Sequence, residues 1–245
     1  MSGEIKVGFS MHPRWAGALG LRAFVEPLRQ AGLEVLEFEL DRNLDMWPDF
    51  QPLMESAVEL GFDLSFHAPY RVPYSLAGFC GARRAAIIRD YAPMLLIAEE
   101  WSRRLPGLRS VVVHAASARL PADLDSLAAD TRAFLAWALE TFPHLCFALE
   151  NNHPAKPGEL KAGDSRAAVL KILSGLPANP RLRACWDMGH DYLADPAGEP
   201  TPSCWRIRLF TKSELSTPHS WQTKRTGLCA ISGVTSNAYF APHAH

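Results

Sequence analysis

Strand-like and helix-like segments alternate along the first 190 residues, and this alternation limits the possible folds more than any other feature. The strand-like segments are short and rich in apolar residues; they span 5–11, 34–40, 63–70, 110–116, 146–152 and 183–191. The intervening segments repeat apolar residues at helical spacing, over 19–31, 51–62, 83–105, 123–142 and 166–176. Strands joined through helices pair in parallel, because the crossover returns the chain to the same edge of the sheet. The sequence therefore predicts an α/β protein with six βα units.

Two α/β architectures accept this order, an open doubly wound sheet and a closed (β/α)8 barrel. An open dinucleotide-binding sheet would show G-x-G-x-x-G after its first strand, whereas this strand leads into MHPRWAGALG. Six units in some 190 residues also match a barrel, which needs about 250 residues for eight units. We therefore expect a TIM-barrel type of fold. Within it, EVLEFEL (34–40) alternates apolar and acidic residues, which predicts a half-buried strand.

The composition of the chain changes near residue 201. Ser and Thr account for 13 of the first 200 residues but 12 of the last 45, and 25 of the 26 acidic residues precede residue 201. WRIRLF (205–210) is compatible with a short helix or a strand, and the rest of the tail has no period of two or 3.6. We expect a barrel-like domain over 1–200 and an atypical tail over 201–245, truncated or frame-shifted. The barrel would then be incomplete, with its first and sixth strands as unpaired edges and 211–245 mostly irregular.

Composition also excludes several classes of protein. The net charge is -1, so no global basic excess indicates a nucleic-acid partner. Five widely spaced cysteines without C-x-x-C exclude a disulfide scaffold and a Cys-rich zinc module, and they favour a reducing compartment. The N-terminus has no signal-peptide pattern, and no stretch approaches the roughly 20 apolar residues of a membrane helix. We expect a cytoplasmic protein without a membrane partner; the oligomeric state stays open.

Four consecutive strands end in residues that bind metals or transfer protons. These residues are His67 on the third strand, His114 on the fourth, Glu150 and Asn151 on the fifth, and Asp187 and His190 on the sixth. In a barrel, the carboxyl ends of all strands meet at one mouth, where active sites are built. A single histidine at a strand end is more often structural, but recurrence on four strands favours one shared site. Glu150 adds weight, because a carboxylate inside an apolar strand is costly unless it is paired or metal-bound.

Imidazole and carboxylate groups together suit Zn²⁺, Mn²⁺ or Co²⁺, and carboxylates can bridge two ions. The predicted metal ligands are His67, His114, Glu150, Asp187 and His190. Tyr70 and Arg71 follow His67 and could contact a sugar or phosphate, although surface solvation explains them about as well. His153 is expected to be solvated. Cys146 and Cys185 are expected to be buried fillers, since cysteine often behaves as a small apolar residue.

At these residues the sequence resembles the xylose isomerase-like TIM-barrel superfamily. This superfamily holds sugar isomerases and epimerases together with endonuclease IV-type enzymes (AP endonuclease family 2). The matching segments are DLSFHAPY (63–70), VVVHAA (111–116), FALENN (147–152) and CWDMGHDY (185–192), within the span from 5 to 200. The resemblance implies that Glu150 and Asp187 bind a divalent metal and act catalytically, moving a proton between adjacent carbons. The predicted substrate-binding residues are Tyr70, Asn151 and His114.

The endonuclease branch implies different roles for the same residues. There, His67 and His114 would join a bridging Glu150 on one zinc, and His190 would serve a third zinc. That branch also needs a later Asp-x-His, which residues 191–245 lack. The isomerase branch in turn expects a histidine on strand seven and a glutamate on strand eight, for which the tail shows no strand signal.

We therefore expect a divalent-metal-dependent isomerase or epimerase that acts on a small-molecule sugar or sugar phosphate. The alternatives are a zinc phosphodiesterase acting on abasic DNA and an inactive, truncated barrel.

Overall fold

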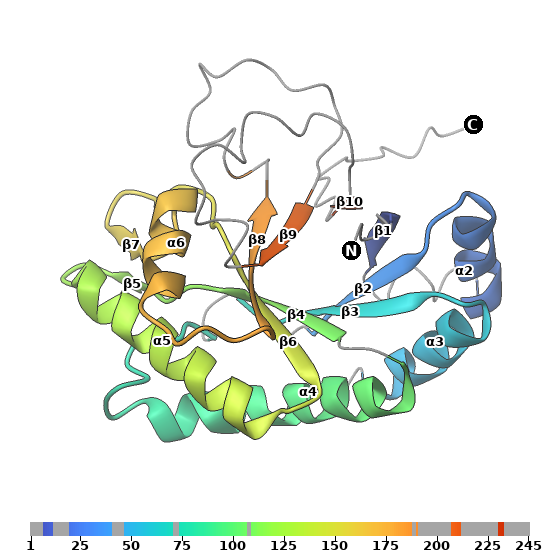
Figure 1. Cartoon of the computed structure of the whole chain (residues 1–245), viewed down its shortest axis with the longest axis horizontal. Helices are drawn as coiled ribbons and strands as arrows, with labels where there is room; N and C mark the ends of the chain where they lie inside the picture. Colours follow the sequence, from blue (N-terminus) through green and yellow to red (C-terminus); the bar gives the residue numbers. More distant parts are fainter. Residues whose placement is uncertain are drawn as a thin grey trace, which may run out of the picture.

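The computed structural model describes residues 7–11, 20–40, 47–70, 74–106, 109–187, 190, 207–211 and 230–232. Six strands are mutually parallel: β1 Val7–Met11, β2 Val35–Glu39, β3 Asp63–His67, β4 Arg109–His114, β6 Leu145–Glu150 and β8 Leu182–Asp187. Five helices lie between them: α2 Leu21–Gln30, α3 Trp47–Glu59, α4 Arg84–Arg104, α5 Leu124–Thr141 and α6 Arg166–Ser174. Figure 1 shows the sheet curling, with the helices around its outer side. The prediction of an incomplete α/β barrel of TIM-barrel type is confirmed.

Both edges of the six-stranded sheet carry a further strand. β9 (Ile207–Thr211) pairs antiparallel with β8, and β10 (Ala230–Ser232) pairs parallel with β1. The prediction that the first and sixth strands are unpaired edges is therefore wrong, because extended segments of the tail satisfy their free N–H and C=O groups. Of the segment WRIRLF, the described residues 207–210 form a strand, which is one of the two predicted alternatives. The boundary at residue 200 and the rest of the tail lie outside the described residues.

A small antiparallel pair follows strands β4 and β6. It consists of β5 (Ser117–Arg119) and β7 (Glu159–Lys161), with Ser117 opposite Lys161 in the register. Three residues are too few to show a period of two, so the sequence analysis missed both strands. β5 begins three residues after the end of β4, and β7 follows β6 after the loop 151–158, so the pair extends from the carboxyl end of the sheet, where the predicted site lies.

Alternation along each strand separates two buried surfaces. One set of residues packs against the helices in the main core; it includes Leu36, Phe38, Leu64, Phe66, Val111, Val113, Phe147 and Leu149. The alternate residues Val35, Val112, Ala148 and Cys185 form a second, smaller apolar cluster. Side chains two positions apart lie on the same face of a strand. Glu37, His114, Glu150 and Asp187 therefore share the face of this inner cluster, one step closer to the carboxyl ends.

The loop before α4 is fixed to α5 by Asp130. The carboxylate of Asp130 accepts the backbone N–H groups of Gly78 at 2.6 Å and Cys80 at 2.7 Å, and the residue is 6% exposed. Gly78 has a φ of +86°, a conformation that glycine adopts readily and that residues with a Cβ atom disfavour. Hydrogen bonds to a buried carboxylate are stronger than those between neutral groups. Asp130 thus holds this glycine-containing turn in place.

Replacing Asp130 with asparagine should destabilise the protein by about 2 kcal/mol, because the amide NH₂ cannot accept one of the two hydrogen bonds. Urea unfolding of wild type and variant measures the loss. Asp125→Asn is the matched control on the same helix, since that side chain is 82% exposed and its ion pair within the described residues is with exposed Lys171. Equal losses for the two variants would mean that the turn does not depend on Asp130.

None of the helices in the described part of the chain is long and apolar enough to cross a membrane.

Candidate metal centre

A cavity of about 630 Å³ opens at the carboxyl ends of the barrel strands. All five predicted metal ligands line it: His67, His114, Glu150, Asp187 and His190. Glu150 is 2% exposed and lies at the end of β6, between β4 and β8. The parallel register places His114 directly opposite Glu150. Strand-end residues far apart in the sequence thus meet in one place because the strands are parallel.

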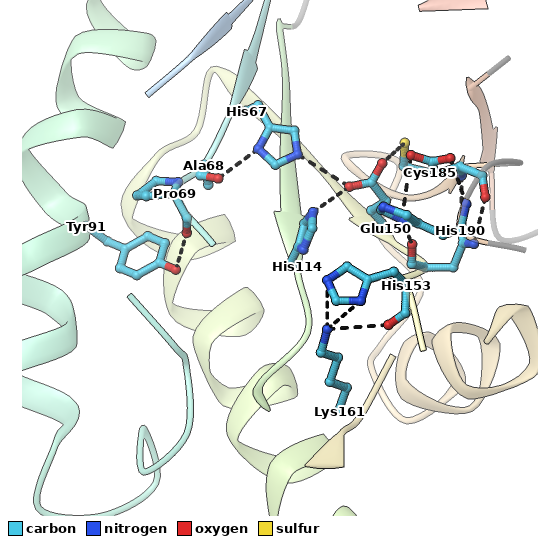
Figure 2. Close-up of polar contacts among 12 residues, drawn as sticks. His67, Ala68, Pro69, Tyr91, His114, Glu150, His153, Lys161, Cys185 and His190 are labelled. Carbon is cyan, nitrogen blue, oxygen red and sulfur yellow. Dashed lines mark hydrogen bonds and ion pairs between the residues drawn. The ribbon is translucent and has the colours of Figure 1, made fainter. Parts of the chain in front are cut away.

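Two histidines contact one oxygen of Glu150. The Nε2 atom of His114 lies 2.6 Å from Glu150 Oε2, and the Nε2 atom of His67 lies 3.3 Å from it (Figure 2). The Nδ1–H of His67 donates to the carbonyl oxygen of Ala68 at 2.8 Å, which fixes the ring. Ligand atoms of the two histidines and Glu150 lie within 4.8 Å of one another. Two nitrogens and an oxygen at this spacing can hold a divalent metal.

A second ligand group shares Glu150. Ligand atoms of Glu150, Asp187 and His190 also lie within 4.8 Å of one another. The backbone N–H of His190 donates to Asp187 Oδ1 at 3.1 Å, and His190 Nδ1–H donates to the carbonyl oxygen of Asn151 at 2.7 Å. This leaves Nε2 of His190 available to a metal. Metal-binding histidines are typically oriented by such a hydrogen bond from their other ring nitrogen.

The structure does not place Asn151 on the cavity wall. Asn151 is 1% exposed; its Oδ1 accepts the backbone N–H of Asp187 at 2.7 Å, and its Nδ2 donates to the backbone oxygen of Asp187 at 2.9 Å. Both halves of the amide therefore hold β8 beside β6. This geometry does not support the predicted contact with substrate; it supports a role in positioning Asp187.

Tyr70 lies on the cavity wall, where a substrate contact was predicted. Its ring stacks on His114 with centroids 4.5 Å apart and meets the ring of His67 edge-on at 5.2 Å. Tyr70 thus packs against both imidazoles that face Glu150. Arg71, the neighbouring candidate, lies outside the described residues.

Glu37 on β2 is a cavity residue that the sequence analysis missed. It is 1% exposed, and the hydroxyl of Ser65 donates to its Oε2 at 3.4 Å. The prediction of a half-buried strand over 34–40 is wrong here, because the acidic face turns into the barrel and not toward solvent. Burial raises the pKa of Glu37 to about 7. Glu37 lies two residues after apolar Val35, on the same face of its strand, just as Glu150 lies two residues after Ala148. This shared spacing could have predicted Glu37 as a site residue.

His153 and Lys161 also line the cavity, where His153 is half-buried. His153 lies in the loop after β6, and Lys161 ends β7, which follows that loop. Cys146 and Cys185 are buried, as predicted, and Cys185 Sγ lies 3.9 Å from Glu150 Oε1.

The three residues of the first ligand group have strongly shifted pKa values. Burial lowers the pKa of His114 to about 4. Burial also favours neutral His67, but the hydrogen bond and negative charge of Glu150, together with the charge of Glu37, outweigh it and raise the pKa of His67 to about 9. Although burial opposes it, the two histidines hold the pKa of Glu150 far below its ordinary value. Without metal, the group therefore contains a His67–Glu150 ion pair and a neutral His114.

The raised pKa of His67 predicts a pH-dependent stability of the metal-free protein. A raised folded-state pKa contributes stability that is complete below the unfolded value, near 6.5, and is lost as the pH rises through about 9. We expect the stability difference between wild type and His67→Gln to shrink by about 3 kcal/mol from pH 6 to pH 9.5. Urea unfolding with a chelator present measures it. A difference that stays constant with pH would rule out the ion pair.

No protein-family model matches the sequence, and no curated protein matches it. Solved structures do share its fold. A D-allulose 3-epimerase from Methylomonas sp., in complex with D-allulose, has a TM-score of 0.53 and 15% identity, over 80% of this chain and 67% of that chain. A D-psicose 3-epimerase from Clostridium cellulolyticum H10, with D-tagatose, has a TM-score of 0.53 and 13% identity, over 78% and 66%. The chain therefore shares the fold of these two epimerases, in agreement with the expected TIM-barrel type.

Proposed function

We propose that the chain is a divalent-metal-dependent isomerase or epimerase of a sugar or sugar phosphate. The observation that carries the proposal is the position of Glu150, a buried carboxylate shared by two ligand groups inside one cavity. The fold agrees with this proposal, since solved structures that share it include enzymes named as ketose 3-epimerases.

The residues fit a divalent metal. His67 and His114 with Glu150 would hold one ion, and Asp187 and His190 are placed to complete its coordination. His67 and His190 each donate Nδ1–H to a backbone carbonyl, which orients Nε2 as a ligand. When bound, the metal would polarise a carbonyl or hydroxyl oxygen of the substrate.

The chain's own carboxyl groups would move the protons. An epimerase removes a proton from one face of a carbon and returns one to the other face, so it needs acid–base groups on two sides of the substrate. We assign these roles to Glu150, Asp187 and the newly found Glu37. The pKa of Glu37, raised by burial to about 7, suits a group that gains and loses a proton at neutral pH. Tyr70 would contact the sugar beside His114.

The test is an activity panel on protein depleted of metal and reloaded with Mn²⁺, Co²⁺ or Zn²⁺. D-allulose, D-tagatose and phosphorylated ketoses are incubated with each form, and epimers are separated by chromatography. We expect metal-dependent conversion of at least one ketose, with losses of at least about a hundredfold in Glu37→Gln and Glu150→Gln. Tight metal binding without conversion of any ketose would contradict the proposal.

The shared Glu150 also favours a second candidate, a zinc phosphodiesterase, since a bridging carboxylate is typical of two-metal sites. Metal stoichiometry separates the two: about one ion per chain supports the epimerase, and two or three support the phosphodiesterase. Incubation of the zinc-loaded protein with an abasic oligonucleotide provides the matching activity test, and strand cleavage would favour the second candidate.

A further inference from the structure

The cavity has a cationic side that the proposed metal chemistry does not use. Lys161, at the end of β7, is 6% exposed and lines the cavity together with Lys156 and His153. Lysine is almost never buried unless its ammonium group is paired. The contacts of this ammonium group therefore indicate what Lys161 does there.

His153 is the hydrogen-bond acceptor of Lys161. The Nζ atom lies 3.0 Å from the ring nitrogens of His153 (Figure 2). Since Nδ1 lies 3.0 Å from the carbonyl oxygen of Pro154 and donates to it, Nε2 is left to accept from Lys161. Burial lowers the pKa of His153, which keeps the ring neutral for this purpose.

No carboxylate of the described residues lies within hydrogen-bonding distance of this ammonium group. The nearest, Glu159 Oε2, is 3.7 Å away and lies 3.2 Å from the backbone N–H of Lys156, which donates to it. The carbonyl oxygen of His153 is a weak partner at 3.4 Å. Lys161 thus presents a positive charge to the cavity wall, with its two longest contacts, to Glu159 and to the carbonyl oxygen of His153, weak enough to be replaced by a better acceptor.

The charges around the cavity indicate which kind of group could accept a hydrogen bond from Lys161. Its wall carries five carboxylates, Glu37, Glu39, Glu150, Glu159 and Asp187, against Lys156 and Lys161. A bound metal would neutralise the carboxylates near Glu150. The positive charges of Lys156 and Lys161 lie apart from that site and would remain. The ring of His153 lies 5.7 Å from that of His190, so a single imidazole separates Lys161 from the second ligand group. One extended sugar can reach both.

We propose that Lys161, assisted by Lys156, binds an anionic group, a phosphate or a carboxylate, on the sugar whose reacting carbons lie at Glu150. The inference rests on the proposed function and narrows its substrate to phosphorylated or acidic sugars. Neutral ketoses would offer this ammonium group no charged partner beyond the loose ion pair with Glu159, whereas an anionic group would add a charge-assisted hydrogen bond.

The test compares three probes on the metal-loaded protein by calorimetry: D-fructose, D-fructose 6-phosphate and D-fructuronate. We expect wild type to bind one anionic probe at least about tenfold more tightly than D-fructose, as a charge-assisted hydrogen bond implies. The phosphate and carboxylate arms identify which anion is preferred. Lys161→Met should abolish the preference, Lys161→Arg should retain part of it, and the surface control Lys171→Met should retain all of it.

Two outcomes would overturn the inference: no preference in wild type, or a preference that Lys161→Met leaves intact. If the preference is lost in Glu150→Gln but kept in Lys161→Met, the anion binds the metal and not Lys161. Metal-dependent epimerisation of neutral ketoses alone would leave the proposed function standing while this inference fails. Thermal unfolding of Lys161→Met verifies its fold, which should persist because a neutral side chain replaces a buried charge.

Discussion

Replacing Glu150 with glutamine is expected to weaken Zn²⁺ or Mn²⁺ binding by about a hundred- to a thousandfold. Glu150 is the one residue common to both ligand groups, so the substitution removes a charged oxygen ligand from each. Site affinities of about 10–16 kcal/mol spread over four ligands correspond to roughly 3–4 kcal/mol per ligand. Glutamine retains the shape of the side chain, so the loss reports charge and not packing. Calorimetric titration of metal-depleted protein measures the affinity.

Glu159→Gln is the matched control for this experiment. Glu159 lines the same cavity, but its side chain is 30% exposed and it belongs to neither ligand group. Its replacement should leave the metal affinity within about twofold, since exposed charges interact weakly. Equal metal affinities for wild type, Glu150→Gln and Glu159→Gln would remove Glu150 from the metal site.

The largest expected loss of stability follows from replacing Phe147 with alanine. Phe147 is fully buried on β6, and its backbone pairs with Val111 on β4 and Leu182 on β8. Truncation of a buried phenylalanine costs about 3–5 kcal/mol, from lost transfer free energy and the cavity left behind. That is a large part of the stability of an ordinary domain. Urea unfolding followed by circular dichroism measures the change.

Phe147→Leu is the control that keeps most of the apolar volume, and it should cost less than about 1.5 kcal/mol. The pair also tests the inactive-barrel alternative. A packed core predicts one sharp transition in wild type that moves to a lower urea concentration in Phe147→Ala. A broad, non-cooperative transition that neither substitution moves would favour the alternative of a damaged barrel.

The strands and helices up to residue 187 could be predicted because each repeats a pattern long enough to read. Val111 to Val113 mark a buried strand, and Ile87, Tyr91 and Ala98 show a helical period; both elements occur as expected. Elements of three residues, such as β5 and β7, carry no such pattern. The position of β9 depended on an unpaired edge elsewhere in the sheet, which local sequence does not encode.

The candidate site could be predicted where a charged or titratable residue stands in, or at the end of, an otherwise apolar strand. Glu150 stands in an apolar strand, and His67 and His114 close two others, so their convergence followed from parallel pairing. Glu37 was missed because alternation of apolar and acidic residues is the ordinary pattern of a solvent-facing strand. Lys161 was missed because it ends β7, a strand of three residues that is too short to show a regular pattern in the sequence.

The account is tested most directly by proton exchange in D₂O. Metal-loaded wild type is incubated with ketoses and ketose phosphates, and nuclear magnetic resonance records deuterium at carbon atoms beside the carbonyl group. The account predicts metal-dependent deuterium incorporation together with the epimeric or isomeric product, and neither in Glu150→Gln. Absence of deuterium from every ketose, with cleavage of an abasic oligonucleotide by the same zinc-loaded protein, would contradict it.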